Sequence, residues 1–236
     1  MLIWDSPAGL EVYMVQRPGR GDFPDLHVFP GGKVDETDWA PDFCFGLDDA
    51  TASARLGIDE GGLRYWMAVA RECFEECGVL LARNETGLLN FSDAAVRDKY
   101  AADREALLGG DLGFVELLDR DGLMVACDHL GYFSHWITPE VAPRRFDTRF
   151  FLAAMPDDQA TLAHTGETAD DQWERPGDAL ARHQRGEWQM IDPTLRSLET
   201  LSQFTTVGDA LVGVWEGNHL MPLTPELNAQ GMQKLR

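Results

Sequence analysis

The sequence predicts an α/β or α+β fold, because segments with strand-like patterns alternate along the chain with segments of helical periodicity. Runs of β-branched and aromatic residues indicate strands, and they lie at residues 10–17, 129–137, 145–154 and 160–167. The clearest helical segment covers residues 63–77 and is followed by Gly78, a residue type that commonly ends helices. At 236 residues, the chain is long enough to form one domain with a sizeable core.

The N-terminal part is expected to contain a pair of strands. Residues 10–17 alternate apolar and polar side chains, and residues 26–29 are expected to pair with them across a loop rich in glycine and proline at residues 18–24. Residues 38–62 mix prolines and glycines with a short helix expected at residues 48–56. This stretch is interpreted as an excursion from the fold, either a lid or a packing loop.

Further helices are expected in the rest of the chain. One is expected over residues 92–108, because the serine and aspartate at its start are typical capping residues. Shorter helices are expected at residues 113–118 and 177–184. The last begins at Asp192-Pro193-Thr194, with the aspartate as cap and the proline in the first helical position.

The helix at residues 63–77 carries three carboxylates in an unfavourable place. At about 100° per residue, Glu72, Glu75 and Glu76 share one face and the opposite face is apolar. If Gly78 ends the helix, Glu75 and Glu76 lie at the negative end of its dipole, which favours cations instead. Either this is a solvated acidic face, or a divalent cation neutralises it, because Mg²⁺ prefers carboxylate oxygens and is often shared with substrate phosphates.

A glycine-rich turn upstream favours the cation. Phe29-Pro30-Gly31-Gly32 precedes a further acidic cluster that ends at Asp38, and a Gly-Gly pair permits close backbone approach to a ligand. The turn and the acidic helix together resemble the Nudix box, in which glycine, five residues, glutamate and seven residues precede Arg-Glu-(apolar)-x-Glu-Glu-x-Gly-(apolar). The residues of this chain that match the box are Gly32, Arg71, Glu72, Cys73, Glu75, Glu76, Gly78 and Val79.

The chain departs from this box in two places. Asp38 stands where the first glutamate is expected, and residues 39–70 stand where the usual spacer has seven residues. The long insertion, together with residues 135–139 and 144–151, resembles the Nudix branch that contains the peroxisomal coenzyme A diphosphatase. The resemblance covers most of the chain.

Membership in this family implies a mixed β-sheet sandwiched between helices. It also implies a single Nudix hydrolase domain over residues 1–236 with two insertions. One insertion, at about residues 39–62, lies inside the box, and the other is a helical insertion at about residues 82–128.

The resemblance also assigns roles to the matching residues. Glu72, Glu75 and Glu76 are expected to bind Mg²⁺ or Mn²⁺, and Gly32 is expected to present backbone groups to the metal or to phosphate. Glu75, Glu76 and Arg71 are also the expected catalytic residues, with the arginine orienting a glutamate through a charge-assisted pair.

Two roles have alternatives at this point. Asp38 either pairs with the motif arginine, which is the favoured interpretation, or binds metal directly. The catalytic base is either a motif glutamate or an acidic residue of a later loop, where Glu167, Asp170 and Asp171 lie. Of these three, Glu167 is the chosen candidate.

Three arginines interrupt the negatively charged chain: Arg144, Arg145 and Arg149. A guanidinium group suits phosphate oxygens, so these residues are expected to bind a terminal phosphate of the substrate. The alternative is that they pair with Asp147 or with other carboxylates.

The composition narrows the class of partner. A formal net charge of −20 and a pI near 4.5 repel polyanions, so duplex nucleic acid is not expected as a main partner. No apolar run reaches the 18 residues that indicate a membrane span, and residues 1–5 lack the pattern of a signal peptide. Cys73 and Cys77 share the apolar face of the acidic helix, which indicates core residues rather than a zinc site. A reduced, cytoplasmic location and no membrane partner are therefore expected.

Together these observations predict a Mg²⁺- or Mn²⁺-dependent hydrolase that cleaves the diphosphate linkage of a small nucleoside diphosphate derivative. The branch resemblance favours coenzyme A or acyl-CoA, while dinucleotides and nucleotide sugars would serve the same chemistry. A catalytically silent Nudix-fold binding protein, acting as a nucleotide sensor, is the alternative from another class. An unrelated acidic metal-binding module is the third. Dimers are frequent in the family, so the resemblance allows a homodimer.

Overall fold

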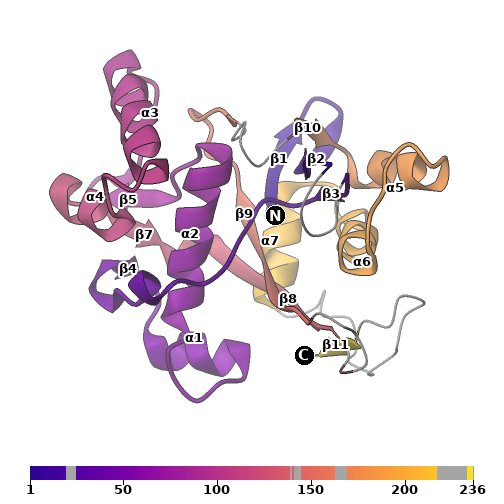
Figure 1. Ribbon diagram of the computed structural model, residues 1–236, viewed down its shortest axis with the longest axis horizontal. Helices are drawn as coiled ribbons and strands as arrows, with labels where there is room; N and C mark the ends of the chain where they lie inside the picture. Colours follow the sequence, from indigo (N-terminus) through magenta and orange to yellow (C-terminus); the bar gives the residue numbers. More distant parts are fainter. Residues whose placement is uncertain (20–24, 139, 141–144, 163–168, 217–232, 236) are drawn as a thin grey trace. The chain divides into compact units, whose positions relative to one another are not determined.

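The computed structural model describes residues 1–19, 25–138, 140, 145–162, 169–216 and 233–235. The chain divides into two compact units, and Figure 1 labels most of their helices and strands. The first unit comprises Met1–Phe29, Gly131–Ala154 and Thr168–Arg236, and the second comprises Pro30–Leu130 and Met155–Glu167.

The first unit is built on a mixed sheet. Among the described residues, this sheet has seven strands in the order β10-β2-β1-β9-β8-β11, with β3 also paired to β2. β1 pairs antiparallel with β2 and parallel with β9, so the sheet combines both strand directions. The strands are β1 Leu2–Ser6, β2 Gly9–Gln16, β3 His27–Val28, β8 Leu130–Ile137, β9 Asp147–Ala154, β10 Asp170–Glu174 and β11 Gln233–Leu235.

Three helices of the same unit complete the core beside this sheet. They are α5 Pro176–Gln184, α6 Asp192–Leu201 and α7 Val207–Trp215. α7 packs on β1 and β9, α5 packs on β2, and α6 packs against α5. Ile3, Val12 and Leu152 from the strands and Leu198 and Leu201 from α6 have no exposed side-chain surface. Burial of each such side chain contributes about 1.5–3 kcal/mol, which makes this cluster the main stabilising element of the unit.

The second unit is mainly helical. Its helices are α1 Asp49–Leu56, α2 Leu63–Cys77, α3 Ala94–Leu108 and α4 Phe114–Asp121. A small sheet in the order β4-β7-β5-β6 accompanies them, formed by Cys44–Phe45, Met124–Ala126, Ala82–Asn84 and Gly87–Leu88. α2 packs against α1, α3, β4 and β7. In Figure 1, α1 lies near the end where α2 begins and α3 lies near the end where α2 stops.

α2 has the limits and the buried face that its periodicity predicts. It covers Leu63–Cys77 and ends at Gly78, whose φ of 71° is left-handed. Trp66, Met67, Ala70 and Phe74 are at most 1% exposed, so the apolar stripe faces the core of the unit. The glutamates of the opposite face are thereby left at the surface of the helix that the core does not use.

The start of α2 is held by the preceding helix, α1. The Asp49 carboxylate accepts hydrogen bonds from the amides of Gly61 at 2.9 Å and Leu63 at 3.0 Å, and the Ser53 hydroxyl accepts one from Gly62 at 2.9 Å. The first amides of a helix have no partner within the helix itself. Side chains of the inserted segment therefore supply the N-terminal cap of α2.

Most predicted elements are confirmed. β2 and β3 pair as expected, α1 is capped by Asp48, and α3 is capped by Asp93. α4 extends to Asp121, beyond the predicted end at residue 118, because the left-handed residue that ends it is Gly122, with φ of 62°. In α6 the cap is Ile191, so Asp192 is the first helical residue rather than the cap.

The strand expected at residues 160–167 is tested only at its start. Residues 160–162 form no strand, and residues 163–168 lie outside the described part of the chain. The strand of this region is β10, Asp170–Glu174, which pairs antiparallel with β2. β10 is the end member of the sheet order, and charged residues are common on such edges. β1 and α7 are two further elements that the sequence pattern does not reveal.

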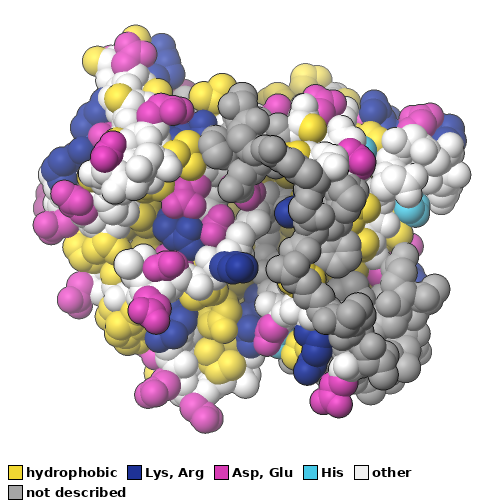
Figure 2. Space-filling view, viewed as in Figure 1, with side chains coloured by type: hydrophobic (Ala, Val, Ile, Leu, Met, Phe, Trp, Pro, Cys, Tyr) yellow, Lys and Arg dark blue, Asp and Glu magenta, His cyan; other side chains and the backbone are white. Residues whose placement is uncertain are grey.

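The fold class predicted from the sequence, with sheets and helices mixed, is confirmed, while the organisation as one domain with two insertions stays a prediction. Acidic side chains are spread over the face drawn in Figure 2, with lysines and arginines between them. In the described part of the chain, every helix is too short or too polar to cross a membrane.

Candidate functional site

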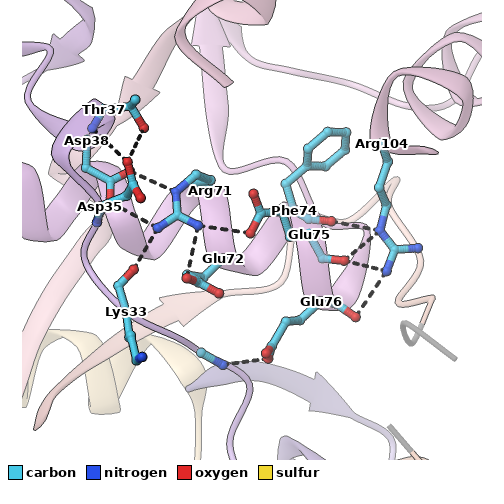
Figure 3. A network of polar contacts seen from close by, with 11 residues as sticks. Lys33, Asp35, Thr37, Asp38, Arg71, Glu72, Phe74, Glu75, Glu76 and Arg104 are labelled. Carbon is cyan, nitrogen blue, oxygen red and sulfur yellow. Dashed lines mark hydrogen bonds and ion pairs between the residues drawn. The ribbon is translucent and has the colours of Figure 1, made fainter. Parts of the chain in front are cut away.

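Residues of the Nudix-like box meet in the second unit, around the guanidinium of Arg71 (Figure 3). Its Nε donates to Asp38 Oδ1 at 2.8 Å and its Nη2 to Asp38 Oδ2 at 3.0 Å. Its Nη1 donates to Glu72 Oε1 at 3.0 Å and to Glu75 Oε2 at 2.9 Å, and Nη2 also donates to the Lys33 carbonyl at 2.8 Å. One buried cation therefore holds three carboxylates and the segment that follows the Gly-Gly turn.

The electrostatics of this network favour the charged form of Arg71. Burial alone would lower its pKa, but the hydrogen bond with Asp38 and the charges of Glu72, Asp38 and Glu75 outweigh that effect and raise it. The guanidinium is therefore permanently positive, and its fork can engage several oxygens at fixed angles.

Asp38 serves this network as a structural partner. Its side chain is 1% exposed, and its Oδ2 accepts a further hydrogen bond from the Asp35 amide at 2.7 Å. Asp38 is the last residue of the short 3-10 helix Glu36–Asp38, and together with Asp35 it forms a capping box at the start of that helix. The pairing of Asp38 with the motif arginine, favoured from the sequence, is confirmed.

Glu72 lies directly against the Gly-Gly turn. A Cβ added to Gly32 would stand 2.4 Å from both carboxylate oxygens of Glu72, so only glycine fits while that side chain keeps its position. Burial raises the pKa of Glu72, against the opposing effect of Arg71. The neighbouring Gly31 has a φ of 148° and donates its amide to Glu76 Oε2 at 2.6 Å.

A divalent cation fits the chemistry of these donors. Glu72, Glu75 and Glu76 offer hard carboxylate oxygens, and with Asp38 they carry more negative charge than the guanidinium of Arg71. The raised pKa of Glu72 shows that its ionised form is disfavoured, and a bound cation would relieve this. As the side chains stand, however, the described residues contain no group of three acidic, histidine or cysteine side chains arranged around one ion.

The predicted later-loop acids belong to the first unit or to the residues that the structure does not describe. Glu167 lies outside the described residues. Asp170 and Asp171 belong to β10 in the first unit, so the prediction that they lie in a loop is wrong. Asp171 accepts a hydrogen bond from the Tyr13 hydroxyl at 2.7 Å, across the β10–β2 pair.

The predicted phosphate-binding arginines belong to the first unit or to the undescribed residues. Arg144 lies outside the described part, and Arg145 donates to the Thr138 carbonyl at 3.0 Å. Arg149 donates to Asp147 Oδ1 at 3.0 Å, which is the pairing that formed the alternative interpretation. His135 Nε2 lies 2.5 Å from the same carboxylate oxygen. Phosphate binding by these arginines stays a prediction.

One residue that contacts the acidic helix α2 lies outside the Nudix-like motif. Arg104 of α3 is 3% exposed and binds backbone carbonyls at the end of α2. A signal was available in the sequence, because Arg104 shares one side of α3 with Tyr100 and Leu107 at helical spacing. An arginine within an apolar stripe indicates a buried guanidinium with a definite partner.

Residues 60–201, more than half of the chain, match the family model described as the NUDT19 Nudix domain. The chain belongs to the NUDT19 Nudix family. The matched residues of this chain include the Arg71–Glu76 segment of the Nudix-like box. Gly32 and Asp38 precede the matched range.

Named relatives of this Nudix chain agree with that membership. The protein named nudix hydrolase 7 from Caenorhabditis elegans is 29% identical over 216 residues, which cover 91% of this chain and 62% of the relative. The acyl-coenzyme A diphosphatase NUDT19 from Homo sapiens is 26% identical over 235 residues, covering 85% of this chain and 63% of the relative. The chain thus spans less than two thirds of the length of these relatives.

A solved structure extends the agreement to the fold. The NUDIX hydrolase from Alicyclobacillus acidocaldarius superposes with a TM-score of 0.67 and 25% sequence identity. The superposition covers 89% of this chain and 92% of the other. The Nudix fold predicted from the split box is confirmed.

Proposed function

We propose that this NUDT19 Nudix domain is a divalent-metal-dependent hydrolase of the diphosphate linkage in a nucleoside diphosphate derivative. The observation that carries the proposal is the network around Arg71. It collects Asp38, Glu72 and Glu75 on one guanidinium, beside a turn whose Gly32 can approach Glu72 closely. A solvated acidic face would need neither the buried ion pair nor the glycine.

The cation would be held by Glu72, Glu75 and Glu76, which offer the oxygen donors that Mg²⁺ and Mn²⁺ prefer. When bound, such a cation neutralises phosphate charge and makes water a better nucleophile. The protein supplies the positioning. Arg71 orients two of the glutamates, and the Gly31 amide orients Glu76. The proton of the attacking water passes to a motif glutamate or to Glu167, as the family resemblance suggests.

Coenzyme A or an acyl-CoA is the substrate we propose within this class. The support is the family match and the name of the human relative, an acyl-coenzyme A diphosphatase. Water would add across one P–O bond of the diphosphate, giving 3′,5′-adenosine diphosphate and a phosphopantetheine product. A dinucleotide or a nucleotide sugar would undergo the same reaction. Arg145 and Arg149 are the described residues that we propose for phosphate binding.

The test is incubation with coenzyme A, an acyl-CoA, a dinucleotide and a nucleotide sugar, each with Mg²⁺, with Mn²⁺ and with EDTA. Products are identified by mass, and ¹⁸O-labelled water shows which phosphorus is attacked. Glu76→Gln is expected to lower kcat about 100-fold or more. Glu105→Gln, an exposed glutamate of α3, is the matched control that keeps full activity.

A catalytically silent sensor is the second candidate, because Asp38 replaces the expected glutamate and residues 39–70 interrupt the box. Tight binding of one compound without turnover of any compound would support the sensor and overturn the hydrolase.

A further inference from the structure

A buried arginine from the helical insertion reaches the end of α2. Arg104 Nε lies 2.9 Å from the Phe74 carbonyl oxygen and 3.0 Å from that of Glu75. Its Nη2 lies 2.7 Å from the Glu75 carbonyl oxygen and 3.2 Å from that of Glu76. Figure 3 shows this guanidinium on the backbone of the turn whose side chains carry the acidic groups.

With these bonds the end of α2 is fully satisfied. The last four carbonyls of a helix have no partner within it. Gly78 donates to the Phe74 carbonyl at 3.0 Å, and the Leu162 amide donates to the Cys77 carbonyl at 2.7 Å. Arg104 provides the donors for the Glu75 and Glu76 carbonyls that lie between them.

The charge of Arg104 also offsets the unfavourable placement of carboxylates at the end of α2. Glu75 and Glu76 lie at the negative end of the helix dipole, where additional anions are unfavourable. A guanidinium placed on the terminal carbonyls opposes that field. Because Arg104 is only 3% exposed, water screens it weakly, and its planar fork restricts how the turn can move.

We infer that Arg104 is a positioning residue for the proposed cation site, because its guanidinium fixes the turn of α2 that carries Glu75 and Glu76. The inference rests on the proposed function and extends it to the α3 segment. Arg104 acts through backbone carbonyls, and its influence on the cation passes through the placement of the two glutamates.

The test is direct Mn²⁺ binding to the 236-residue protein, measured by electron paramagnetic resonance and by calorimetry without substrate. Arg104→Met is expected to weaken Mn²⁺ binding about 10- to 100-fold, which is the usual effect of losing a residue that holds metal ligands in place without touching the metal. Arg97→Met is the matched control. Arg97 lies on the same helix and donates to the Phe91 and Ser92 carbonyls, at 2.8 and 2.7 Å, which do not belong to α2. Its Mn²⁺ affinity is expected to equal that of the wild type.

Two more variants separate positioning from stability. Arg104→Lys keeps the charge without the fork and is expected to recover part of the affinity. Leu107→Ala lowers stability through the buried face of α3 and is expected to leave Mn²⁺ affinity unchanged while the protein is folded. If Arg104→Met is folded by circular dichroism and binds Mn²⁺ like the wild type, the inference is overturned. If Arg104→Met does not fold, Arg104→Lys provides the test. A loss of Mn²⁺ affinity in Arg104→Lys that is no larger than the loss in Leu107→Ala then overturns the inference.

The inference and the proposed function fail in different ways. Wild-type protein that binds Mn²⁺ but hydrolyses no diphosphate contradicts the function and leaves the role of Arg104 measurable. Wild-type protein that binds no Mn²⁺ overturns both.

Discussion

Arg71 and Asp38 form a two-pronged ion pair, with Nε to Oδ1 at 2.8 Å and Nη2 to Oδ2 at 3.0 Å. The two residues are separated in sequence by residues 39–70, yet they meet as neighbours in the same unit. Both side chains are largely buried, at 11% and 1% exposure. The interrupted box is therefore intact in space, and the aspartate reaches the arginine from the short helix Glu36–Asp38.

Asp38→Asn is expected to destabilise the protein by about 1.5–3 kcal/mol. The amide keeps the shape of the side chain but cannot accept both charge-assisted hydrogen bonds of Arg71. Urea unfolding monitored by circular dichroism measures the loss. Asp42→Asn, at an exposed position, is the control, and equal stability of the two variants would contradict a structural role for Asp38.

Gly32→Ala is expected to reduce diphosphate hydrolysis about 100-fold with little change in stability. The new Cβ would displace the Glu72 carboxylate, whose oxygens would lie 2.4 Å away, and small misplacements of such groups are costly for catalysis. Steady-state kinetics measure kcat and KM. At Gly177 an added Cβ meets nothing within 4 Å, so Gly177→Ala is expected to be fully active. An active Gly32→Ala variant would exclude close packing at Gly32 as a requirement.

Glu72→Gln is expected to raise stability at pH 7 in EDTA. Burial raises the pKa of Glu72 above its ordinary 4.5, so the native state binds this proton more tightly than the unfolded chain. The resulting stabilisation is fully present below the unfolded pKa and is lost as pH rises through the folded pKa. The variant removes this loss, and its advantage disappears as pH falls toward 4.5.

Unfolding curves between pH 4 and 8, at about half-unit steps, would follow this advantage of Glu72→Gln through the window that the linkage relation sets. Glu105→Gln, on the exposed face of α3, is the matched control for removal of a carboxylate. A Glu72→Gln protein that is less stable than the wild type at pH 7 would show that its bond with Arg71 dominates over burial.

Mn²⁺ is expected to stabilise the wild type by about 2.7 kcal/mol at a concentration 100 times its Kd, and EDTA is expected to reverse the effect. Glu75→Gln and Glu76→Gln should each reduce this stabilisation, because each removes a charged oxygen donor. Thermal unfolding with and without Mn²⁺ provides the measurement. Equal shifts in the wild type and in both variants would place the binding of Mn²⁺ elsewhere.

Local patterns predict much of this molecule. The limits of α2 follow from its apolar periodicity and from Gly78, and the caps of α1 and α3 follow from Asp48 and Asp93. The candidate carboxylates can also be identified from the sequence, because carboxylates at the C-terminal end of a helix are unfavourable with respect to its dipole.

The contacts that pattern reading misses are long-range or lie in segments of unusual composition. Arg104 binds main-chain carbonyls at the end of α2. Every residue has such a carbonyl, so the residue types do not reveal the partner. β10 begins with two aspartates at the edge of a sheet, where solvent tolerates charge, so its polarity resembles that of a loop. α7 is nearly all apolar over Val207–Trp215, and without a polar face it gives no amphipathic signal.

The cap that α1 places on the start of α2 limits how this chain can be shortened. Asp49 and Ser53 accept the amides of Gly61, Gly62 and Leu63, and a Cβ at Gly62 would come within 2.3 Å of the Ser53 nitrogen. Replacing the insertion at residues 39–62 with a short linker would remove these acceptors together with α1, the helix that carries them. The segment that interrupts the motif in the sequence thus stabilises the start of the helix that carries the motif.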